Sequence, residues 1–254
     1  MASLPLAGLR VLVTRPENEG AEEWATALAA AGAVALAYPT VAILPPDSWQ
    51  PLDQALGRLA EYDWIIFTSQ TAVAFMLGRL AGGRFPEDMR PRIAAVGPKT
   101  AKAVAERGGR VALVPADNRQ EGLASAMAAL PRGTRLLFPL ASGGRTFLVE
   151  NLRAQGCKVD VVSAYKTVPL PSLPRLPAFD VAAFASPSAL RAFVARLGCG
   201  PLQGKTVAVI GPTTAKEAAS HGLRPVVAQN PDVDALISAI AKSRTAQGGP
   251  HVLS

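Results

Sequence analysis

The sequence is poor in cysteine, histidine and aromatic residues, and this scarcity excludes several classes of site. It has two cysteines, Cys157 and Cys199, and two histidines, His221 and His251, among 254 residues. Their spacing matches no metal-binding pattern, and a structural zinc site needs about four such ligands. We therefore expect no metal site and no disulfide framework. With no recognisable signal peptide, we expect a cytoplasmic protein.

The patterns that identify many cofactor enzymes and membrane proteins are also missing. Neither Gly-x-Gly-x-x-Gly nor Gly-x-x-x-x-Gly-Lys-Ser/Thr occurs, so nucleotide-binding sites lack their usual fingerprint. Residues 24–46 are uncharged, but they are rich in alanine and contain Gly32, Pro39, Pro45 and Pro46. This stretch predicts a helix, a short strand and a linker, and we expect no membrane span.

The chain is basic without an obvious nucleic-acid-binding pattern. It has 26 Lys and Arg against 19 Asp and Glu, a formal net charge of +7, and 6% aromatic residues. The basic residues are scattered, and neither a basic run nor an aromatic stacking platform is apparent. We expect no nucleic-acid partner; a basic cleft for a small polyanion fits the charge equally well.

Three blocks of sequence occur twice, in the order C-A-B-C-A-B. Identity supports blocks A and B, and pattern supports block C. The copies are 63–75 and 180–193 for A, 92–102 and 206–216 for B, and 10–14 and 135–139 for C. If the repeated unit is A-B-C, residues 63–165 hold one complete copy and the other copy is split between the two ends of the chain. The split predicts two interleaved lobes joined by two chain crossings, with a hinge beside a cleft.

The alternation of short apolar runs with helical stretches predicts two α/β lobes with parallel sheets. The expected first lobe is residues 1–37 with 178–242, the second is 47–164, the extended connectors are 38–46 and 165–177, and a disordered tail is 243–254. Strands are expected at 10–14, 33–37, 63–68, 92–96, 110–114, 134–139, 158–162, 180–185, 205–210 and 224–228. Helices are expected at 17–31, 50–60, 70–81, 98–107, 119–130, 144–155, 187–197, 212–220 and 232–242.

The repeated hydroxyl and glycine residues fall where strands end and helices begin. Such turns in parallel α/β units carry binding groups, and free N–H groups at a helix start attract carboxylate or phosphate. The candidate anion-binding residues are Thr68, Ser69, Gly97, Thr100, Ser186, Ser188, Gly211, Thr213 and Thr214. Serine and threonine at these positions are also ordinary helix caps, and a Gly-Pro turn can be purely structural.

The ordered series of motifs resembles the uroporphyrinogen-III synthase family from about residue 9 to 241. The motifs are Phe-Thr-Ser-x-x-Ala-Val at 67–73, Ala-Val-Gly-x-x-Thr-Ala at 95–101, Leu-Phe-Pro at 137–139, Tyr-Lys-Thr-Val at 165–168, Phe-Ala-Ser-Pro-Ser at 184–188 and Ile-Gly-Pro-Thr-Thr-Ala at 210–215. The resemblance implies two α/β lobes joined by a two-stranded connector, with the N-terminal segment completing the C-terminal lobe.

The resemblance also implies a reaction that needs neither cofactor nor metal. The linear tetrapyrrole hydroxymethylbilane, which carries eight carboxylates, loses its terminal hydroxyl and closes to a macrocycle with inversion of the last pyrrole ring. Tyr165 aligns with the family's cleft tyrosine and is the candidate catalytic acid. Arg15 and Arg145, in equivalent turns after the two C strands, are candidate carboxylate-binding residues.

Other interpretations remain open at this point. Tyr165 could pack between the lobes without chemistry, and each arginine could be a solvated surface charge. A hinged small-anion-binding or sensor protein would share the architecture, and a nucleotide-dependent regulator is a third alternative. We expect a monomer, with transient contact to the enzyme that supplies the unstable substrate as a further possibility.

Overall fold

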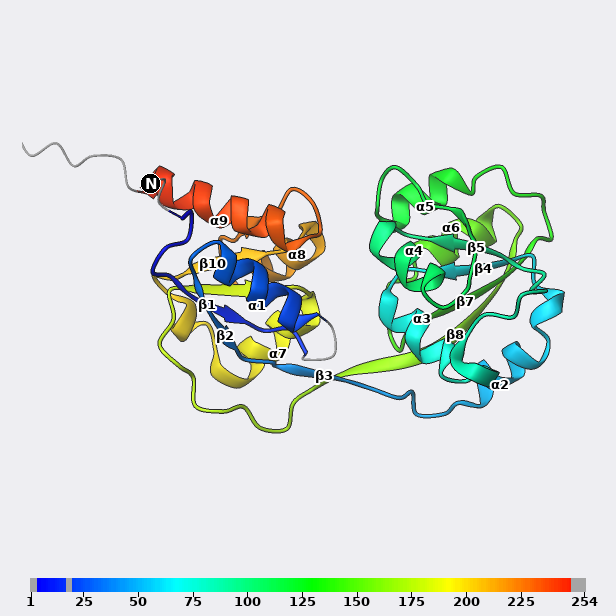
Figure 1. The fold of residues 1–254 in the computed structure, drawn as a ribbon, viewed down its shortest axis with the longest axis horizontal. Coiled ribbons are helices and arrows are strands. Elements are labelled where there is room, and N and C mark those ends of the chain that lie inside the picture. The colour runs from blue at the N-terminus through cyan, green and yellow to red at the C-terminus, as the bar shows by residue number, and fades with distance from the viewer. Residues whose placement is uncertain (1–3, 17–19, 248–254) are drawn as a thin grey trace, which may run out of the picture. The chain divides into compact units, whose positions relative to one another are not determined.

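The chain folds as two α/β units. The computed structural model describes residues 4–16 and 20–247, with side chains up to residue 244. One unit combines residues 1–43 with 168–254, and the other is residues 44–167. In Figure 1 the first unit contains both the blue N-terminal segment and the orange to red C-terminal segment, and the second is cyan to green.

The first unit contains a five-stranded sheet in the order β11-β10-β9-β1-β2. Its strands are β1 (Arg10–Val13), β2 (Val34–Ala37), β9 (Val181–Phe184), β10 (Thr206–Val209) and β11 (Val226–Val227), and all the pairs are parallel. The N-terminal strand β1 lies between β2 and β9, with Val11 opposite Val181. The N-terminal segment therefore completes the sheet of the C-terminal lobe, which confirms the predicted fold class.

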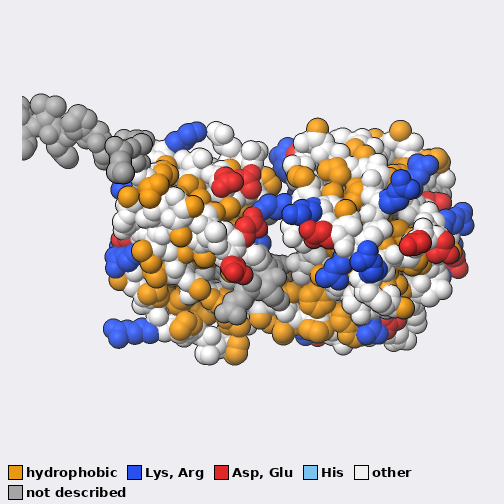
Figure 2. Space-filling view, in the orientation of Figure 1, with side chains coloured by type: hydrophobic (Ala, Val, Ile, Leu, Met, Phe, Trp, Pro, Cys, Tyr) orange, Lys and Arg blue, Asp and Glu red, His pale blue; other side chains and the backbone are white. Residues whose placement is uncertain are grey.

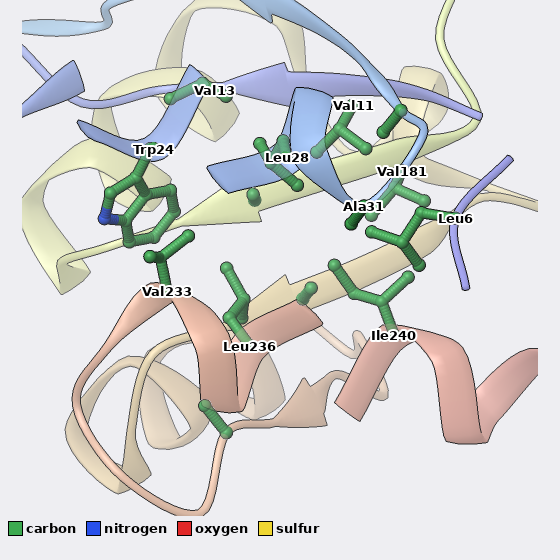
Figure 3. Packing of buried hydrophobic residues seen from close by; sticks show 14 residues of the cluster. Leu6, Val11, Val13, Trp24, Leu28, Ala31, Val181, Val233, Leu236 and Ile240 are labelled. Atoms are coloured by element: carbon green, nitrogen blue, oxygen red, sulfur yellow. The ribbon is translucent and has the colours of Figure 1, made fainter. Parts of the chain in front are cut away.

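Helices cover both faces of this sheet. The helices are α1 (Ala21–Ala30), α7 (Pro187–Leu197), α8 (Pro212–Ser220) and α9 (Val233–Gln247), with the 3₁₀ turn η4 (Gly200–Leu202). Figure 3 shows the core on the α1 and α9 side, where Trp24 and Leu28 of α1 lie among Val233, Leu236 and Ile240 of α9. A second cluster forms under α7 and α8 around Phe184 and Phe193. Both faces are apolar, as expected for buried parallel strands.

The prediction of a disordered tail from residue 243 onward is wrong for residues 243–247, because α9 continues to Gln247. Two contacts hold its last turns: the Ser243 hydroxyl donates to the Ile240 carbonyl at 2.8 Å, and the Arg244 guanidinium donates to the Pro5 carbonyl at 3.3 Å. Neither contact depends on an apolar repeat, so the periodicity of the sequence did not indicate it. Residues 248–254 of the predicted tail, like residues 17–19 of the predicted first helix, lie outside the described part of the chain.

The second unit holds most of a six-stranded sheet in the order β3-β8-β7-β4-β5-β6, in which residues 41–43 of β3 and 168–169 of β8 belong to the first unit. Its strands are β3 (Val41–Leu44), β4 (Trp64–Phe67), β5 (Arg92–Ala95), β6 (Val111–Leu113), β7 (Arg135–Ala141) and β8 (Lys158–Pro169). Its helices are α2 (Gln50–Gly57), α3 (Gln70–Leu77), α4 (Pro98–Ala105), α5 (Gln120–Ala126) and α6 (Phe147–Ala154), with 3₁₀ turns η2 (Leu59–Glu61) and η3 (Ala81–Gly83). Helices α5 and α6 cover a core built on β4, β5, β7 and β8.

Strand β3 and the last part of β8 lie in the segments that were expected to be extended connectors. The sequence predicted only 158–162 as strand, but β8 runs for 12 residues and includes Tyr165 and Lys166. Strand β3 was not predicted as a strand at all, and it pairs with β8. The prolines of these segments lie at or outside the strand ends, where a missing N–H donor breaks no ladder bond. The implied two-stranded connector is thus regular sheet.

The two sheets have the same strand order in terms of the repeated blocks. Strands of blocks B, A and C are neighbours as β5-β4-β7 in one unit and as β10-β9-β1 in the other. The aspartate that begins block A has the same role in both copies: Asp63 accepts from the Arg135 backbone N–H at 2.9 Å, and Asp180 accepts from the Arg10 backbone N–H at 2.9 Å. This carboxylate satisfies the first donor of the adjacent C strand.

Replacing Asp180 with asparagine tests this interaction through its pH dependence. Hydrogen bonds from the Arg10 side chain and backbone hold the pKa of Asp180 below its ordinary value of 3.8. Because the folded-state pKa is the lower one, the ionised carboxylate stabilises the fold above pH 3.8, and that stabilisation is lost as the pH falls through the folded-state pKa.

We expect Asp180→Asn to lower the unfolding free energy by about 1 kcal/mol at pH 7 and by progressively less as the pH falls below 3.8. Urea unfolding of both proteins across this range measures the difference. If the difference in unfolding free energy between the wild type and Asp180→Asn did not change with pH, the stabilising role of the ionised Asp180 carboxylate would be contradicted.

Candidate active site

The side chain of Tyr165 meets that of Ser69 at the carboxyl edge of the second sheet. Tyr165 lies on β8 opposite Ala141, the last residue of the parallel strand β7, and Ser69 follows β4. The phenol and the serine hydroxyl are 3.2 Å apart, and either can be the donor. The Ser69 hydroxyl also accepts from the Ala72 backbone N–H at 3.0 Å, so it caps α3 as well as contacting Tyr165.

Aromatic stacking fixes the plane of the Tyr165 ring. The Tyr165 ring, 9% exposed, stacks on Phe75 at 5.7 Å between centroids, and Phe75 stacks on Trp49 at 6.2 Å. The Arg79 guanidinium lies 5.0 Å from the Trp49 ring and is itself held by both carboxylate oxygens of Asp53. A ring held in this way can present its hydroxyl in a fixed direction.

The sequence analysis did not identify Phe75 or Trp49 as residues of the site. Phe75 closes block A, and its counterpart Phe193 is completely buried in the core of the first unit. Phe75, in contrast, is half-buried against Tyr165.

The start of α4 supplies a second candidate anion-binding turn on the same edge. Helix α4 begins at Pro98, Gly97 is extended with φ −169°, and Thr100 is 5% exposed. An added Cβ at Gly97 would lie 3.2 Å from the Asn118 side chain, so the glycine allows a close approach there and does not serve a left-handed turn. The buried hydroxyl of Thr100 is less accessible to a ligand than the sequence suggested, whereas Thr68 is half-buried at the end of β4.

Arg145 reaches this edge as a member of an ion pair. Its two terminal nitrogens lie 3.3 and 2.5 Å from the carboxylate oxygens of Glu121, and its guanidinium lies 4.8 Å from the Phe147 ring. The hydrogen bond from Arg145 lowers the pKa of Glu121, so the pair is charged at neutral pH. A substrate carboxylate at Arg145 must therefore compete with Glu121.

The first unit offers equivalent turns at the carboxyl ends of β9 and β10. Ser186 caps α7 by accepting from the Ala189 N–H at 3.2 Å, and its hydroxyl lies 3.0 Å from that of Ser188. Both hydroxyls are half-buried. The serines therefore fulfil the capping interpretation and remain partly accessible to a ligand.

The Gly-Pro turn before α8 differs from its copy before α4. Gly211 is extended with φ 179°, and an added Cβ would meet nothing within 4 Å. No close contact therefore requires glycine at position 211, and open space lies beside the helix start. Thr213 is exposed, but Thr214 is 3% exposed. Only Thr213 of this pair is available at the surface.

Arg15 follows β1 at the same edge of the first sheet. Its guanidinium carbon lies 5.1 Å from the centroid of the buried Trp24 ring. The contact is a cation–π interaction, which restrains the arginine near the carboxyl end of β1. The structure thus places Arg15 and Arg145 each at the predicted turn of its own sheet, with neither a freely solvated charge.

Positive and negative side chains are mixed on the face of both units that Figure 2 shows. Figure 2 shows Lys and Arg side chains interspersed with Asp and Glu on the visible face, with no continuous basic stripe. Both cysteines are free, and burial raises the pKa of the Cys157 thiol. Among the residues that the structure describes, no cluster of three or more His, Cys, Asp and Glu could hold a metal ion. Within the same residues, no helix combines the length and apolarity needed to cross a membrane.

Comparison with known proteins gives a consistent result. The family model for "Uroporphyrinogen-III synthase HemD" matches residues 22–238. A uroporphyrinogen-III synthase of Synechococcus elongatus is 34% identical, over 94% of this chain and 97% of its own. A putative uroporphyrinogen-III synthase of Methanothermobacter thermautotrophicus is 31% identical, over 91% of this chain and 97% of its own. The crystal structure of a mutant uroporphyrinogen III synthase from Thermus thermophilus superposes with a TM-score of 0.63 at 19% identity, over 94% of this chain and 99% of its own. The crystal structure of the synthase from Helicobacter pylori superposes with a TM-score of 0.63 at 18% identity, over 93% of this chain and 99% of its own. Both structures show the shared fold.

Proposed function

Because this chain belongs to the uroporphyrinogen-III synthase family, we propose that it closes hydroxymethylbilane to uroporphyrinogen III. The linear tetrapyrrole loses its terminal hydroxyl as water, and ring D is inverted through a spiro intermediate during closure. One observation supports a role for this site in the reaction: the Tyr165 phenol lies 3.2 Å from the Ser69 hydroxyl at the carboxyl edge of a parallel sheet. Ligand-binding groups of α/β sheets are found at this edge.

Tyr165 is the proposed general acid. Its phenol donates a proton to the departing hydroxyl, which leaves as water, and the ring that closes later loses the proton that balances the reaction. The Ser69 hydroxyl can accept from the phenol or donate to it, and it can donate to the phenolate that remains after the transfer, so the contact can persist through the step. Stacking on Phe75 fixes the ring. Positioning and proton transfer of this kind typically account for large parts of a rate enhancement.

The eight carboxylates of the substrate give a purpose to the helix starts of each unit. We propose that Thr68, Ser69, Gly97, Thr100, Ser186, Ser188, Gly211, Thr213 and Thr214 line turns whose backbone N–H groups bind these carboxylates. Arg15 and Arg145 add guanidinium groups at the ends of β1 and β7. Helix starts stabilise anions through free donors and the helix dipole. The buried hydroxyls of Thr100 and Thr214 shape their turns, and the backbone makes the contact.

We further propose that the chemistry needs no cofactor or metal and that the protein acts as a cytoplasmic monomer. Transient contact with the enzyme that supplies the unstable substrate would shorten the time that hydroxymethylbilane spends in solution. An anion-binding protein without catalysis is the alternative, because helix starts that bind carboxylates would serve it equally well.

Turnover distinguishes the enzyme from the binding protein. We expect protein that has been dialysed against a chelator to form many equivalents of the type III isomer per chain. Consumption of hydroxymethylbilane at the uncatalysed rate, without the type III isomer, would favour the binding protein. Activity that disappears on dialysis and returns with a metal would contradict cofactor independence.

A further inference from the structure

A basic hollow lies at the amino edge of the second sheet, opposite the edge that carries Tyr165. Its cavity volume is about 550 Å³, and its lining includes Trp64, Arg90, Arg92 and Arg132. Trp64 and Arg92 are the first residues of β4 and β5, and Arg132 precedes β7. We propose that this hollow is a second anion-binding site, which takes a small organic molecule with two or more carboxylate or phosphate groups.

The guanidinium groups of these three arginines are not neutralised by a carboxylate partner in the described part of the chain. Other arginines of the described residues do form ion pairs with Asp or Glu, namely Arg10, Arg58, Arg79, Arg119, Arg135, Arg145 and Arg191. Within the described residues, Arg90, Arg92 and Arg132 have none. Arg90 donates one bond to the Ala60 carbonyl at 3.0 Å, and Arg92 lies 5.7 Å from the Trp64 ring. Because a guanidinium has five donors, most of this capacity is unused.

The carboxylate in the lining does not neutralise the hollow. Asp63 lines it, but one of its oxygens accepts from the Arg135 backbone N–H at the start of β7. Three positive side chains therefore surround one carboxylate that already has a structural role. The remaining lining, with Trp64, Leu130 and Pro131, is apolar enough to contact the body of an organic anion.

The internal repeat shows that the fold does not require these arginines. Asp63 has its counterpart in Asp180, which makes the same backbone contact in the first unit. At the positions equivalent to Arg90, Arg92 and Arg132, however, the first unit has Gly204, Thr206 and Ala7, and Val181 stands in place of Trp64. The same sheet edge is thus built without a single one of the four side chains. Their presence together in the second unit points to a ligand.

The lining chemistry selects the class of ligand. Planar guanidinium groups bind carboxylate and phosphate through paired N–H donors, and the volume is within the range of about 300–1,000 Å³ found for small-molecule sites. Two sources of such an anion are possible: a tetrapyrrole polycarboxylate, or a nucleotide phosphate. Both share the chemistry of several anionic oxygens on a partly apolar body.

Calorimetric titration of the full chain at low ionic strength tests the proposal without any assay of turnover. The probes are benzenehexacarboxylate and uroporphyrin for the carboxylate source, and pyrophosphate and ATP for the phosphate source. We expect at least one pair to bind, and the double variant Arg90→Ala/Arg132→Ala to weaken that binding by about 10-fold or more, since charge-assisted hydrogen bonds to carboxylate or phosphate are stronger than neutral ones. The tighter pair identifies the source.

Two matched variants separate this site from other anion-binding surfaces. Arg107→Ala removes an exposed arginine that also bonds a backbone carbonyl, that of Gly83 at 3.4 Å, and lies outside the hollow. Arg145→Ala removes an arginine of the proposed substrate site at the opposite edge, so it reports any binding of the probes there. Arg107→Ala should leave the affinity that is lost in the double variant unchanged. The proposal is overturned if no probe binds the wild type at millimolar concentration, or if the double variant binds as tightly as Arg107→Ala.

Discussion

Tyr165→Phe is expected to lower kcat by about 10²- to 10⁴-fold, the range for loss of a general acid, while leaving the melting temperature almost unchanged. Phenylalanine keeps the ring that stacks on Phe75, so packing is retained. It removes the one atom that contacts Ser69 and would donate to the departing hydroxyl. Steady-state rates with fresh hydroxymethylbilane, together with thermal unfolding, measure both quantities.

Tyr62→Phe is the matched control. Tyr62 is 1% exposed, and its hydroxyl donates to Asp160 at 2.6 Å. Burial, followed by the hydrogen bond to Asp160, raises the pKa of Tyr62 to about 12. This hydroxyl lies near the beginning of β8, whereas Tyr165 lies near its end. We expect Tyr62→Phe to lower stability by about 1–3 kcal/mol with kcat unchanged. If both variants lost stability and neither lost turnover, Tyr165 would be a packing residue.

Leu28→Ala and Leu236→Ala are each expected to lower the unfolding free energy by about 2–5 kcal/mol. Both leucines are completely buried in one cluster, although more than 200 residues separate them in sequence (Figure 3). Each substitution leaves a cavity that the surrounding core fills only in part. Because the cluster joins α1 to α9, either change should weaken the whole discontinuous unit.

Hydrogen exchange tests the extent of that unit. Leu28→Ala should speed exchange at β9 and β10 as well as at β1, since these strands share one sheet. Leu152→Ala, at an equally buried position in the core of the second unit, is the control and should affect β4 and β7 instead. Faster exchange confined to residues 4–37 in the Leu28 variant would contradict the proposed assignment of the N-terminal segment to the C-terminal lobe.

The regular elements of this fold were predictable because each depends on local sequence. The apolar runs at β1, β4, β5, β7, β9 and β10 and the Gly-Pro helix starts carried enough information, and the out-of-phase repeat indicated which strands share a sheet. Strand β3 was missed because the prolines around Val41–Leu44 suggested a linker, although the β-branched residues Val41 and Ile43 were a usable signal. Strand β8 was cut short for the same reason.

The details of the site depend on contacts between distant residues. No pattern links Arg145 to Glu121 or Ser69 to Tyr165, because 24 and 96 residues separate the partners. Likewise, Arg90, Arg92 and Arg132 appear as scattered charges until the sheet brings them to one edge. Sequence could identify which turns bear polar groups, but not which groups are already paired or buried.

The most direct test of the whole account is the isomer formed from hydroxymethylbilane. Purified protein is supplied with fresh substrate, and the products are oxidised and separated by chromatography. We expect mainly the type III isomer. It should form faster than the product of the uncatalysed reaction, and the Tyr165→Phe variant should form it much more slowly than the wild type. Formation of only the type I isomer, at the uncatalysed rate, would contradict the account.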